Sequence, residues 1–449
     1  MTYTALGVYV FAGGFSLGVE RHLTVRAHLE DGPYGVATVK LNRPWPIYTD
    51  PRTWPLRDYR GVDLVYCNPP CAAWSQAGTR GSGEKDRWRT DARVGCVENC
   101  FQVFRELRPA VWLWESVPRA LTNGRDMVHR LAGECLTRGY AVTFLLQEAS
   151  LMGVPQRRRR FMFIAHRVAL PWQPLVAKRV TVGEALHGVK PDVILPLSDN
   201  FKRVLAAMGD EVGRLRGWWN AHHPESKRKT HRMGDRLVTT GRPHFLAVRL
   251  DPDDVAPTMT GGAHWFHWRE YRYIAPNESA LLCGFPRDYR WDVPRPYNQI
   301  AQGVMPPVGA YVASVIAAGL RANREPHRGT LRVDLGLRAP EHEALQEPLQ
   351  LVEPRGALDV HAPAVEERAA VLARVLVELH ALERRVQGLE HGVQLDRAVV
   401  GRPGPRRRPL VVGPAHEAGV VGEDRLRPLA PQGLAEVDLV AQPRVVLVP

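Results

Sequence analysis

The sequence predicts a doubly wound α/β fold with a smaller, loop-rich second domain. Three observations support this. Residues 1–166 alternate short apolar runs with amphipathic ones, as strands and helices do when they follow one another around a central sheet. A glycine-bearing turn follows the first apolar run, and residues 167–257 break the alternation. With 449 residues, 45% of them hydrophobic, the chain can build a sizeable core and more than one domain.

The first region supplies the elements of the sheet in order. Its short apolar runs predict strands, and the amphipathic runs between them predict helices. The expected strands are Ala5–Val10, Thr24–Leu29, Val62–Tyr66, Val111–Trp114, Ala141–Leu146 and Phe161–Ala165, and the expected helices are Asp91–Glu106 and Gly124–Arg138. Ligands of such a sheet bind beyond the carboxyl ends of the strands, so the residues after each strand are candidates for a site.

The rest of the chain divides into three parts. Residues 167–257 are rich in Pro, Gly, Trp, His and basic residues and predict a separate domain. Residues 258–324 return to the first domain and end in an apolar helix, Val308–Leu320. Residues 325–449 contain no Phe, Tyr or Trp and many Pro and Gly, so we expect a disordered tail. Heptad spacing from Leu372 to Val393 predicts at most one short helix or coiled coil there.

Composition excludes several classes of protein. No apolar run approaches the roughly 18 residues of a membrane span, and the N-terminus lacks the pattern of a signal peptide. Six cysteines in a chain of this length indicate a reducing cytoplasm with working thiols rather than a disulfide scaffold. The net charge of +13 favours a polyanionic partner such as nucleic acid.

The stretch "VDLVYCNPPCAAWSQAG", residues 62–78, holds a candidate nucleophile, Cys71, after the third strand. Asn68-Pro69-Pro70 resembles the loop of enzymes that methylate exocyclic amino groups of bases, but Cys71 takes the place of their aromatic residue. A thiolate attacks electron-poor carbons, and basic residues in the following loop would favour it. The alternatives are a buried structural cysteine, or a zinc site in which Cys67 and Cys71 join the C-x3-C pair Cys96 and Cys100.

Two further strand ends carry charged residues. "VWLWES" delivers Glu115 beside two tryptophans, where burial would raise its pKa and suit it to carry a proton, although a capping or ion-paired Glu is the alternative. In "GVPQRRRRFMFIA", alternation sends Arg158 and Arg160 to one face and Arg157 and Arg159 to the other. A run of charges is usually solvated, but this one enters an apolar strand, so one face must lie deep.

The first turn, "VYVFAGGFSLGVE" at residues 8–20, is a strand–glycine–helix junction of the kind that lets a cofactor approach the backbone. An acidic residue at the end of the second strand usually binds ribose hydroxyls, and Glu30 is placed for that role. Alone, this pattern is equally compatible with a tight turn that binds nothing.

Together these motifs resemble the DNA cytosine-5 methyltransferase family. The ordered series is "FAGGFSLG", "PPCAAWS", "WES", "VPQRRRR", "RYIAPNESALLCGFP" and "YNQIAQGVMPPVGAYVA", and it covers about residues 5–320. The resemblance implies a Rossmann-like S-adenosylmethionine methyltransferase sheet and makes the Asn-Pro-Pro coincidental. It also implies that Cys71 adds to C6 of a flipped cytosine, that Glu115 holds N3 and the 4-amino group, and that Arg158 holds O2.

The same resemblance places the ligands. Cofactor contacts are expected from Phe11, Gly13, Gly14, Glu30, Asp50, Pro70 and Gln302. DNA contacts are expected from Ser75, Arg80, Arg160, Lys227, Arg228, Lys229 and Arg232. Residues 167–257 would be the target-recognition domain, in which Trp218 and Trp219 either contact DNA or simply pack. Double-stranded DNA is the expected substrate of a monomeric bacterial or phage enzyme, in the cytoplasm and with a cognate restriction endonuclease as a further partner.

The sequence departs from the family pattern at four places. The first glycine loop is short, Ala72 replaces a Gln, Ser116 replaces an Asn, and Ala301-Gln302-Gly303 replaces Gly-Asn-Ser/Ala. None of these removes Cys71, Glu115 or Arg158, so an active enzyme is expected. The rival hypotheses are a related enzyme that modifies RNA and a catalytically inactive DNA-binding regulator.

Overall fold

The structure is a computed structural model that describes most of the first 322 residues and two short segments of the tail. The described ranges are residues 2–75, 87–172, 177–222, 229–233, 236–240, 247–260, 265–322, 331–334 and 445–448. All statements below about contacts and about their absence refer to these residues.

A central sheet organises the described residues, with the strand order β14-β13-β6-β7-β5-β4-β1-β2-β3. Its strands are β1 Thr4–Val8, β2 Thr24–Leu29, β3 Ile47–Tyr48, β4 Leu64–Cys67, β5 Val111–Ser116, β6 Ala141–Glu148, β7 Arg159–His166, β13 Leu331–Asp334 and β14 Val445–Val448. Neighbours from β5 to β3 pair in parallel, whereas β7 is antiparallel to both β5 and β6. The expected doubly wound α/β fold is therefore confirmed.

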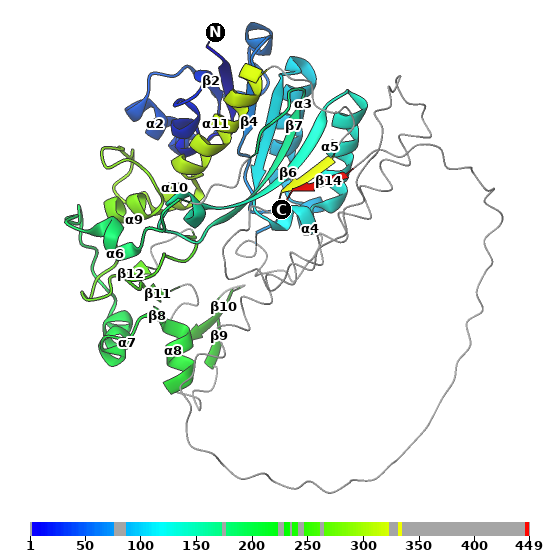
Figure 1. The fold of residues 1–449 in the computed structure, drawn as a ribbon. Helices are drawn as coiled ribbons and strands as arrows, with labels where there is room; N and C mark the ends of the chain where they lie inside the picture. The colour runs from blue at the N-terminus through cyan, green and yellow to red at the C-terminus, as the bar shows by residue number, and fades with distance from the viewer. Residues whose placement is uncertain are drawn as a thin grey trace, which may run out of the picture. The chain divides into compact units, whose positions relative to one another are not determined.

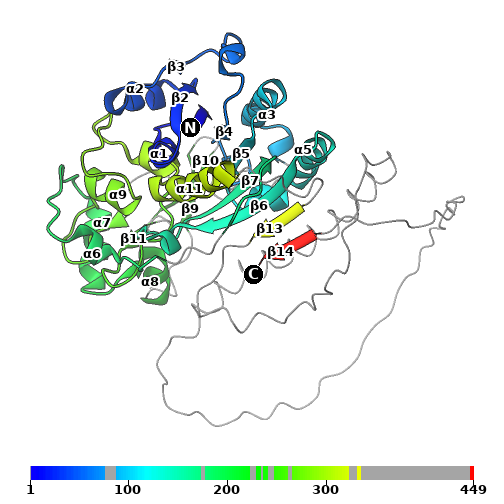
Figure 2. The same ribbon diagram turned by 45° about the horizontal axis from the view of Figure 1, so that its top comes forward.

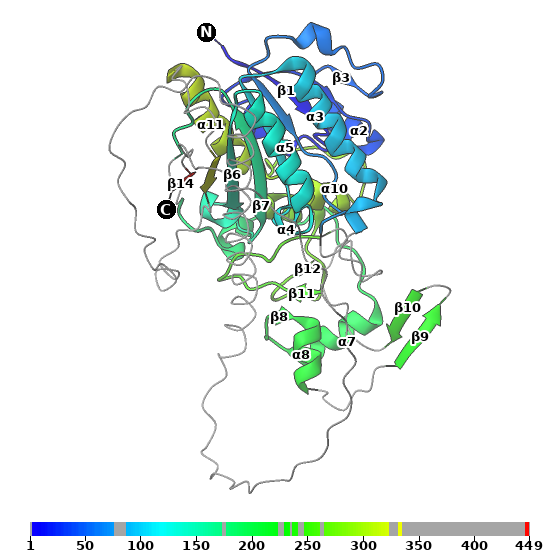
Figure 3. The ribbon, with the colours of Figure 1, turned by 90° about the vertical axis from the view of Figure 1, so that its right-hand side faces the viewer.

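Helices cover both faces of the sheet (Figures 1 and 2). The α-helices are α1 Gly14–Val19, α2 Pro33–Asn42, α3 Gly95–Leu107, α4 Arg119–Asn123, α5 Arg125–Thr137, α6 Val182–Leu186, α7 Asp199–Met208, α8 Leu215–His222, α9 Pro276–Leu282, α10 Tyr297–Gln302 and α11 Pro306–Ala322. Short 3-10 helices span Leu56–Tyr59, Arg87–Arg89, Ala92–Val94 and Ala149–Met152. Figure 3 shows α3 and α5 on one face of the sheet and α11 on the other.

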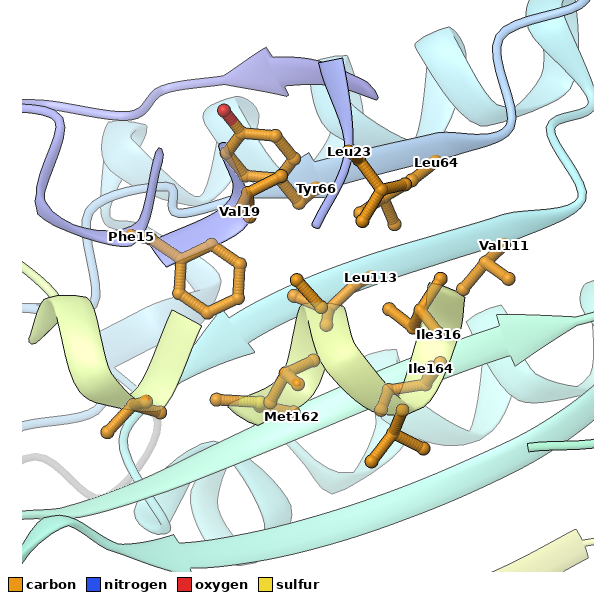
Figure 4. Close-up of a cluster of buried hydrophobic side chains, with 14 of the residues drawn as sticks. Phe15, Val19, Leu23, Leu64, Tyr66, Val111, Leu113, Met162, Ile164 and Ile316 are labelled. Atoms are coloured by element: carbon orange, nitrogen blue, oxygen red, sulfur yellow. The ribbon is translucent and has the colours of Figure 1, made fainter. Parts of the chain in front are cut away.

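The pleat of the sheet sorts its side chains between two cores. On the α11 side, Leu64, Tyr66, Val111 and Leu113 from β4 and β5 pack with Phe15 of α1 and Ile316 of α11 (Figure 4). On the other side, the ring of Trp112 packs against Phe101 and Phe104 of α3. Because strands covered on both faces must be apolar throughout, this explains the continuous apolar runs in the sequence.

Most predicted elements are present, with ends shifted by a few residues. The first strand ends at Val8 rather than Val10, because Tyr9 has a φ of 54° and turns the chain toward the glycines. The helix expected from Asp91 begins at Gly95, after a 3-10 turn that the Asp91 side chain caps by accepting a hydrogen bond from the backbone N–H of Arg93. The sequence analysis did not predict β3 or α2.

The smaller domain contains α7, α8 and the short strands β8 Gly213–Arg214, β9 Lys229–Met233, β10 Arg236–Thr240, β11 Val248–Arg249 and β12 Trp265–Phe266. Leu205, Met208, Leu215 and Phe266 belong to a core of its own. The predicted end of this domain is residue 257, but β12 pairs with β11 and Phe266 joins the same core, beyond that position. Figure 1 shows these elements grouped beyond the carboxyl ends of the parallel strands.

The expected apolar helix of the return segment is α11, which α10 precedes. Together they give a stretch, Tyr297–Ala322, that is long and apolar enough to cross a membrane by composition, with a mean hydropathy of 1.5. Within its apolar segment of 18 residues, 72% is buried inside the protein. This degree of burial, with α11 packed on the sheet in Figure 4, is that of a core helix.

Two segments of the tail differ from the expectation of disorder with at most one helix. Leu331–Asp334 forms β13, parallel to β6, and Val445–Val448 forms β14, parallel to β13. Runs rich in Val and Leu favour extended backbone, and the outer edge of β6 offers free backbone groups for pairing. The segment Leu372–Val393 lies outside the described residues.

Candidate active site

The candidate nucleophile lies where the ends of two parallel strands meet. Cys67, the last residue of β4, pairs with Trp114 of β5, so the loop that carries Cys71 follows β4 at the same edge as Glu115, the penultimate residue of β5. The Cys71 side chain is half-buried. Burial raises the pKa of its thiol, the positive charge of Arg160 opposes that shift, and the negative charge of Glu115 adds to it. A thiol placed in this way needs the nearby cation to become a thiolate.

Glu115 is buried and held from two sides. Its Oε1 forms an ion pair with Nε of Arg160 at 2.7 Å, and its Oε2 accepts a hydrogen bond of 3.4 Å from Nδ2 of Asn68. Burial raises the pKa of this carboxyl, while Arg160, Arg158 and Asn68 oppose the shift. A carboxyl with an elevated pKa beside a thiol is suited to accept and deliver a proton. The sequence prediction of a buried, pKa-shifted glutamate is therefore in agreement with the structure.

The two buried arginines of β7 and its approach make different contacts. Alternation is confirmed, since Arg158 and Arg160 are 1% and 7% exposed whereas Arg157 pairs with Asp254 near the surface. Arg158 donates to the backbone carbonyls of Ala301, Gly303 and Met259, at 2.5, 3.2 and 3.3 Å. Arg160, expected to contact DNA, is the arginine that pairs with the catalytic candidate Glu115. These contacts favour Arg160 as the arginine beside the catalytic carboxyl.

Several buried polar atoms at this edge have no hydrogen-bond partner among the described residues. Among them is Oδ1 of Asn68. Oε1 of Glu115 and Nε of Arg160, by contrast, face each other at 2.7 Å and satisfy each other as an ion pair. Burying a polar atom without a partner is costly, so Oδ1 of Asn68 is a candidate contact for a polar ligand.

The glycine turn and Glu30 form a second cluster, at the ends of β1 and β2. Phe11 and Gly13 have positive φ angles of 50° and 74°, which bend the chain sharply after β1. The buried Glu30 accepts hydrogen bonds from the backbone N–H groups of Phe11, at 2.6 Å, and Gly32, at 2.8 Å. Its carboxylate oxygens have further lone pairs, so the donor set fits the hydroxyl groups of a nucleoside ribose. Burial raises the pKa of Glu30 to about 7.

The other expected cofactor residues lie near these strand ends, with different exposures. Asp50 follows β3, whose Tyr48 carbonyl accepts a hydrogen bond from the Glu30 backbone, and its carboxylate pairs with Arg52. Pro70 is exposed and adjoins Cys71. Gln302 is exposed at the end of α10. These positions are compatible with the predicted roles but do not test them.

Fewer of the expected DNA contacts can be placed. Ser75 is half-buried in the loop after Cys71. Arg80, Lys227 and Arg228 lie outside the described residues, and Lys229 and Arg232 are on β9, although their side chains are not described. Trp218 stacks on His222 with ring centroids 4.3 Å apart, and both tryptophans of the pair pack against the core of the smaller domain.

The four cysteines considered for zinc differ in burial. Cys67 and Cys100 are buried, and Cys100 lies on the inner face of α3. Across the described ranges, no group of three His, Cys, Asp or Glu residues is arranged to hold a metal ion. Asn68, which the sequence pattern indicated only as part of an Asn-Pro-Pro motif, contacts Glu115 in the structure.

Comparison with known proteins agrees with this geometry. The sequence profile of the C-5 cytosine-specific DNA methylase family matches residues 9–318. Type II methyltransferase M.NgoMIV of Neisseria gonorrhoeae is 29% identical, over 72% of this chain and 99% of that protein. Type II methyltransferase M1.HphI of Haemophilus parahaemolyticus is also 29% identical, over 64% of this chain and 79% of that protein.

Solved structures agree on the fold. An E. coli prophage protein described as a DNA modification methyltransferase superposes with a TM-score of 0.52 at 20% identity, over 71% of this chain and all (100%) of that one. The family match spans both strand-end clusters, with Cys71 and Glu115 in one and Glu30 in the other. The chain therefore belongs to the C-5 cytosine-specific DNA methylase family and is a DNA cytosine-5 methyltransferase that uses S-adenosylmethionine.

Proposed function

We propose that Cys71, Glu115 and Arg160 carry out the methylation through a covalent adduct with the target cytosine. C5 of cytosine is a poor nucleophile until a thiolate adds to C6. In this scheme, Sγ of Cys71 forms the bond to C6, the C5–C6 double bond opens, and Glu115 delivers a proton to N3. Arg160, in place of the predicted Arg158, binds O2. S-adenosylmethionine, when bound, supplies the methyl group that C5 takes.

The adduct is then resolved by elimination. A base removes the proton from C5, the C5–C6 double bond re-forms, and the thiolate of Cys71 leaves, while the proton on N3 returns to Glu115. The observation that supports this scheme best is the Glu115–Arg160 ion pair of 2.7 Å at the same strand edge as Cys71. To reach it, the base must leave the duplex, at a cost of a few kcal/mol that contacts in the site offset.

Target recognition is proposed for the smaller domain, residues 167–257 with the extension to β12. Its own core gives it a fixed surface, and its many basic residues suit phosphate contacts. Because the relatives are type II methyltransferases, we also propose a cognate restriction endonuclease as a partner in the cytoplasm of a bacterium or phage-infected host. The enzyme would act as a monomer.

The experiment is product analysis on duplex DNA of mixed sequence with labelled S-adenosylmethionine. Digestion and mass spectrometry of nucleosides should show 5-methylcytosine, and Cys71→Ser should abolish it. Cys96→Ser, which changes a half-buried cysteine of α3, is the matched control and should remain active. N4-methylcytosine that survives Cys71→Ser would contradict the proposal. Sequencing the methylated product identifies the target site.

Fluorine at C5 tests the adduct directly. A target cytosine with fluorine in place of the C5 hydrogen cannot lose a proton, so elimination stops and the enzyme should remain attached to the DNA. We expect a denaturation-resistant complex with the wild type and with Cys96→Ser, and none with Cys71→Ser. Methylation of normal DNA without trapping on fluorinated DNA would argue against the covalent path.

A further inference from the structure

Asn68 begins the Asn-Pro-Pro before Cys71, and the family resemblance gives it no role. Asn68 follows the last residue of β4, directly beside the end of β5, because Cys67 pairs with Trp114. Its side chain therefore points to the same strand edge as Glu115. The structure confirms the contact, since Nδ2 of Asn68 donates to Oε2 of Glu115 at 3.4 Å.

The orientation of this amide follows from the chemistry of its neighbour. An ionised carboxylate only accepts hydrogen bonds, so the amide nitrogen of Asn68 must face Glu115 and the amide oxygen must face away. That oxygen, Oδ1, is buried and has no hydrogen-bond partner within the described ranges. A buried carbonyl without a partner is costly, and a donor from outside the chain would satisfy it.

The polar side chains at this strand edge match one edge of cytosine. The 4-amino group of the base has two N–H donors, whereas N3 and O2 are acceptors. Glu115 can satisfy one N–H and N3, and Arg160 can satisfy O2, which leaves one N–H of the amino group. Oδ1 of Asn68 is a buried acceptor without a partner on the residue that contacts Glu115.

We propose that Asn68 belongs to the target-base pocket: its Nδ2 holds Glu115 in place, and its Oδ1 accepts a hydrogen bond from the 4-amino group of the flipped cytosine. This inference rests on the proposed function of Cys71 and Glu115 and adds a determinant of specificity to it. Uracil and thymine carry a carbonyl oxygen at position 4, which two facing acceptors repel. Asn68 thus selects cytosine over a deaminated base in the same sequence.

The groups that set the protonation of Glu115 surround it on three sides. Arg160 and Arg158 come from the β7 side, Cys71 from the loop after β4, and Asn68 from the end of β4 itself. The amide N–H of Asn68 favours the ionised carboxylate. Its removal raises the pKa of Glu115, so the limb of the pH–rate profile that reports this carboxyl moves to higher pH.

The test uses the full chain and duplexes that carry the identified target site with either cytosine or deoxyuridine at the methylated position. Asn68→Ala removes both polar atoms. Asn68→Asp is isosteric, and it keeps an acceptor but loses the donor to Glu115. Asn42→Asp is the matched control, because Asn42 donates to the carbonyls of Thr38 and Arg290, outside the strand-end clusters.

We expect Asn68→Ala to lower kcat/KM on cytosine DNA by about 10- to 100-fold, as for loss of a hydrogen bond to a charged or buried group. The rate on deoxyuridine should not fall in parallel, so discrimination between the bases shrinks. Both Asn68 variants should shift the Glu115 limb upward, Asn68→Asp further because a second carboxylate opposes ionisation of the first. Asn42→Asp should change neither quantity.

Three outcomes would overturn the inference. One is an equal loss on both bases with an unmoved pH profile, which indicates a purely structural role. Another is full activity of Asn68→Ala with unchanged discrimination. The third is an unmoved pH profile in Asn68→Asp. This outcome keeps the inference testable even if Asn68→Ala does not fold. Absence of 5-methylcytosine with the wild type would instead contradict the proposed function, so the two failures are distinguishable.

Discussion

If Glu30 binds the ribose as proposed, the burial of this single carboxyl predicts a cofactor affinity that depends on pH. Its pKa is raised from 4.5 to about 7 by desolvation, which outweighs the hydrogen bonds from Gly32 and Phe11. Ribose hydroxyls donate to the ionised form, so the affinity for S-adenosylmethionine should rise as the pH increases through 7. Below that pKa, the affinity can change by at most about tenfold for each pH unit. Calorimetric titration of the DNA-free enzyme at pH 6 and pH 8 measures this change.

The variant Glu30→Gln provides the control, because it cannot ionise and should bind the cofactor more weakly with little pH dependence. The same shift affects stability with a defined sign. Between pH 4.5 and 7, the folded enzyme binds more protons at Glu30 than the unfolded chain, so the free energy of unfolding contributed by this group falls as the pH rises. A pH dependence of cofactor affinity that persists in Glu30→Gln would assign the effect to another group.

The positions of Cys71 and Glu115 were predictable from the sequence, because one strand end specifies one side chain. Our proposal of Arg160 rather than Arg158 beside the base required the register of β7 on β5. Alternation places both on one face, but Ser116 pairs with Phe161, so Arg160 lies just beyond the end of β5. Arg158 is two residues farther along, roughly 6–7 Å away, and reaches the return segment instead. Sequence pattern gives the face of a strand but not its register against a distant partner.

At the scale of elements, the contact between α1 and α11 depends on glycines. A Cβ added to Gly309 of α11 would overlap the backbone carbonyl of Phe15, and one added to Gly18 of α1 would overlap the backbone of Pro306 and Ala310. Gly→Ala inside a helix ordinarily stabilises by about 1 kcal/mol. Here we expect Gly309→Ala and Gly18→Ala to lower the free energy of unfolding by about 1–3 kcal/mol, because the two backbones must separate.

Urea denaturation followed by tryptophan fluorescence measures this effect. The matched control is Gly95→Ala at the start of α3, where an added Cβ meets no atom within 4 Å and the φ is −55°. That variant should be as stable as the wild type or slightly more so. If Gly309→Ala matched Gly95→Ala, the close packing of α1 on α11 would not be a source of stability.

The strands of the central sheet could be predicted because burial on both faces demands uninterrupted apolar runs. Short elements carry less signal. β3 has only two residues, Ile47–Tyr48, and its pairing with β2 is set by the tertiary fold. In the same way, β12 joins the smaller domain through Trp265–Phe266, in a region whose motifs belong to the catalytic domain. Domain boundaries of this kind follow from packing rather than from local composition.

At the scale of the whole molecule, the net charge of +13 predicts that DNA binding weakens steeply with salt. The catalytic edge, by contrast, hides its charges, since Glu115 and Arg160 neutralise each other in a buried pair. We therefore expect affinity for the duplex to come from residues outside the two strand-end clusters, and base selection to come from within them. The ordered motifs allowed the sequence to identify the chemistry, whereas the surface that reads the DNA sequence depends on loop geometry that motifs do not encode.

The tail provides the last prediction, because its described strands lie away from the site. β13 pairs with Val142–Leu145 in the middle of β6, and β6 is separated from β5 by β7. The family match ends at residue 318, before the tail begins. A variant that ends at residue 324 should therefore methylate DNA at a rate within about twofold of that of the full chain, because changes outside a site usually have small effects.

Removal of β13 exposes the edge of β6, an apolar strand with free backbone groups, so this variant should aggregate more readily. Initial methylation rates and light scattering at matched concentrations test both expectations. Loss of catalysis without aggregation would mean that the tail acts on the site itself, whereas equal solubility would mean that β13 does not protect the edge of the sheet.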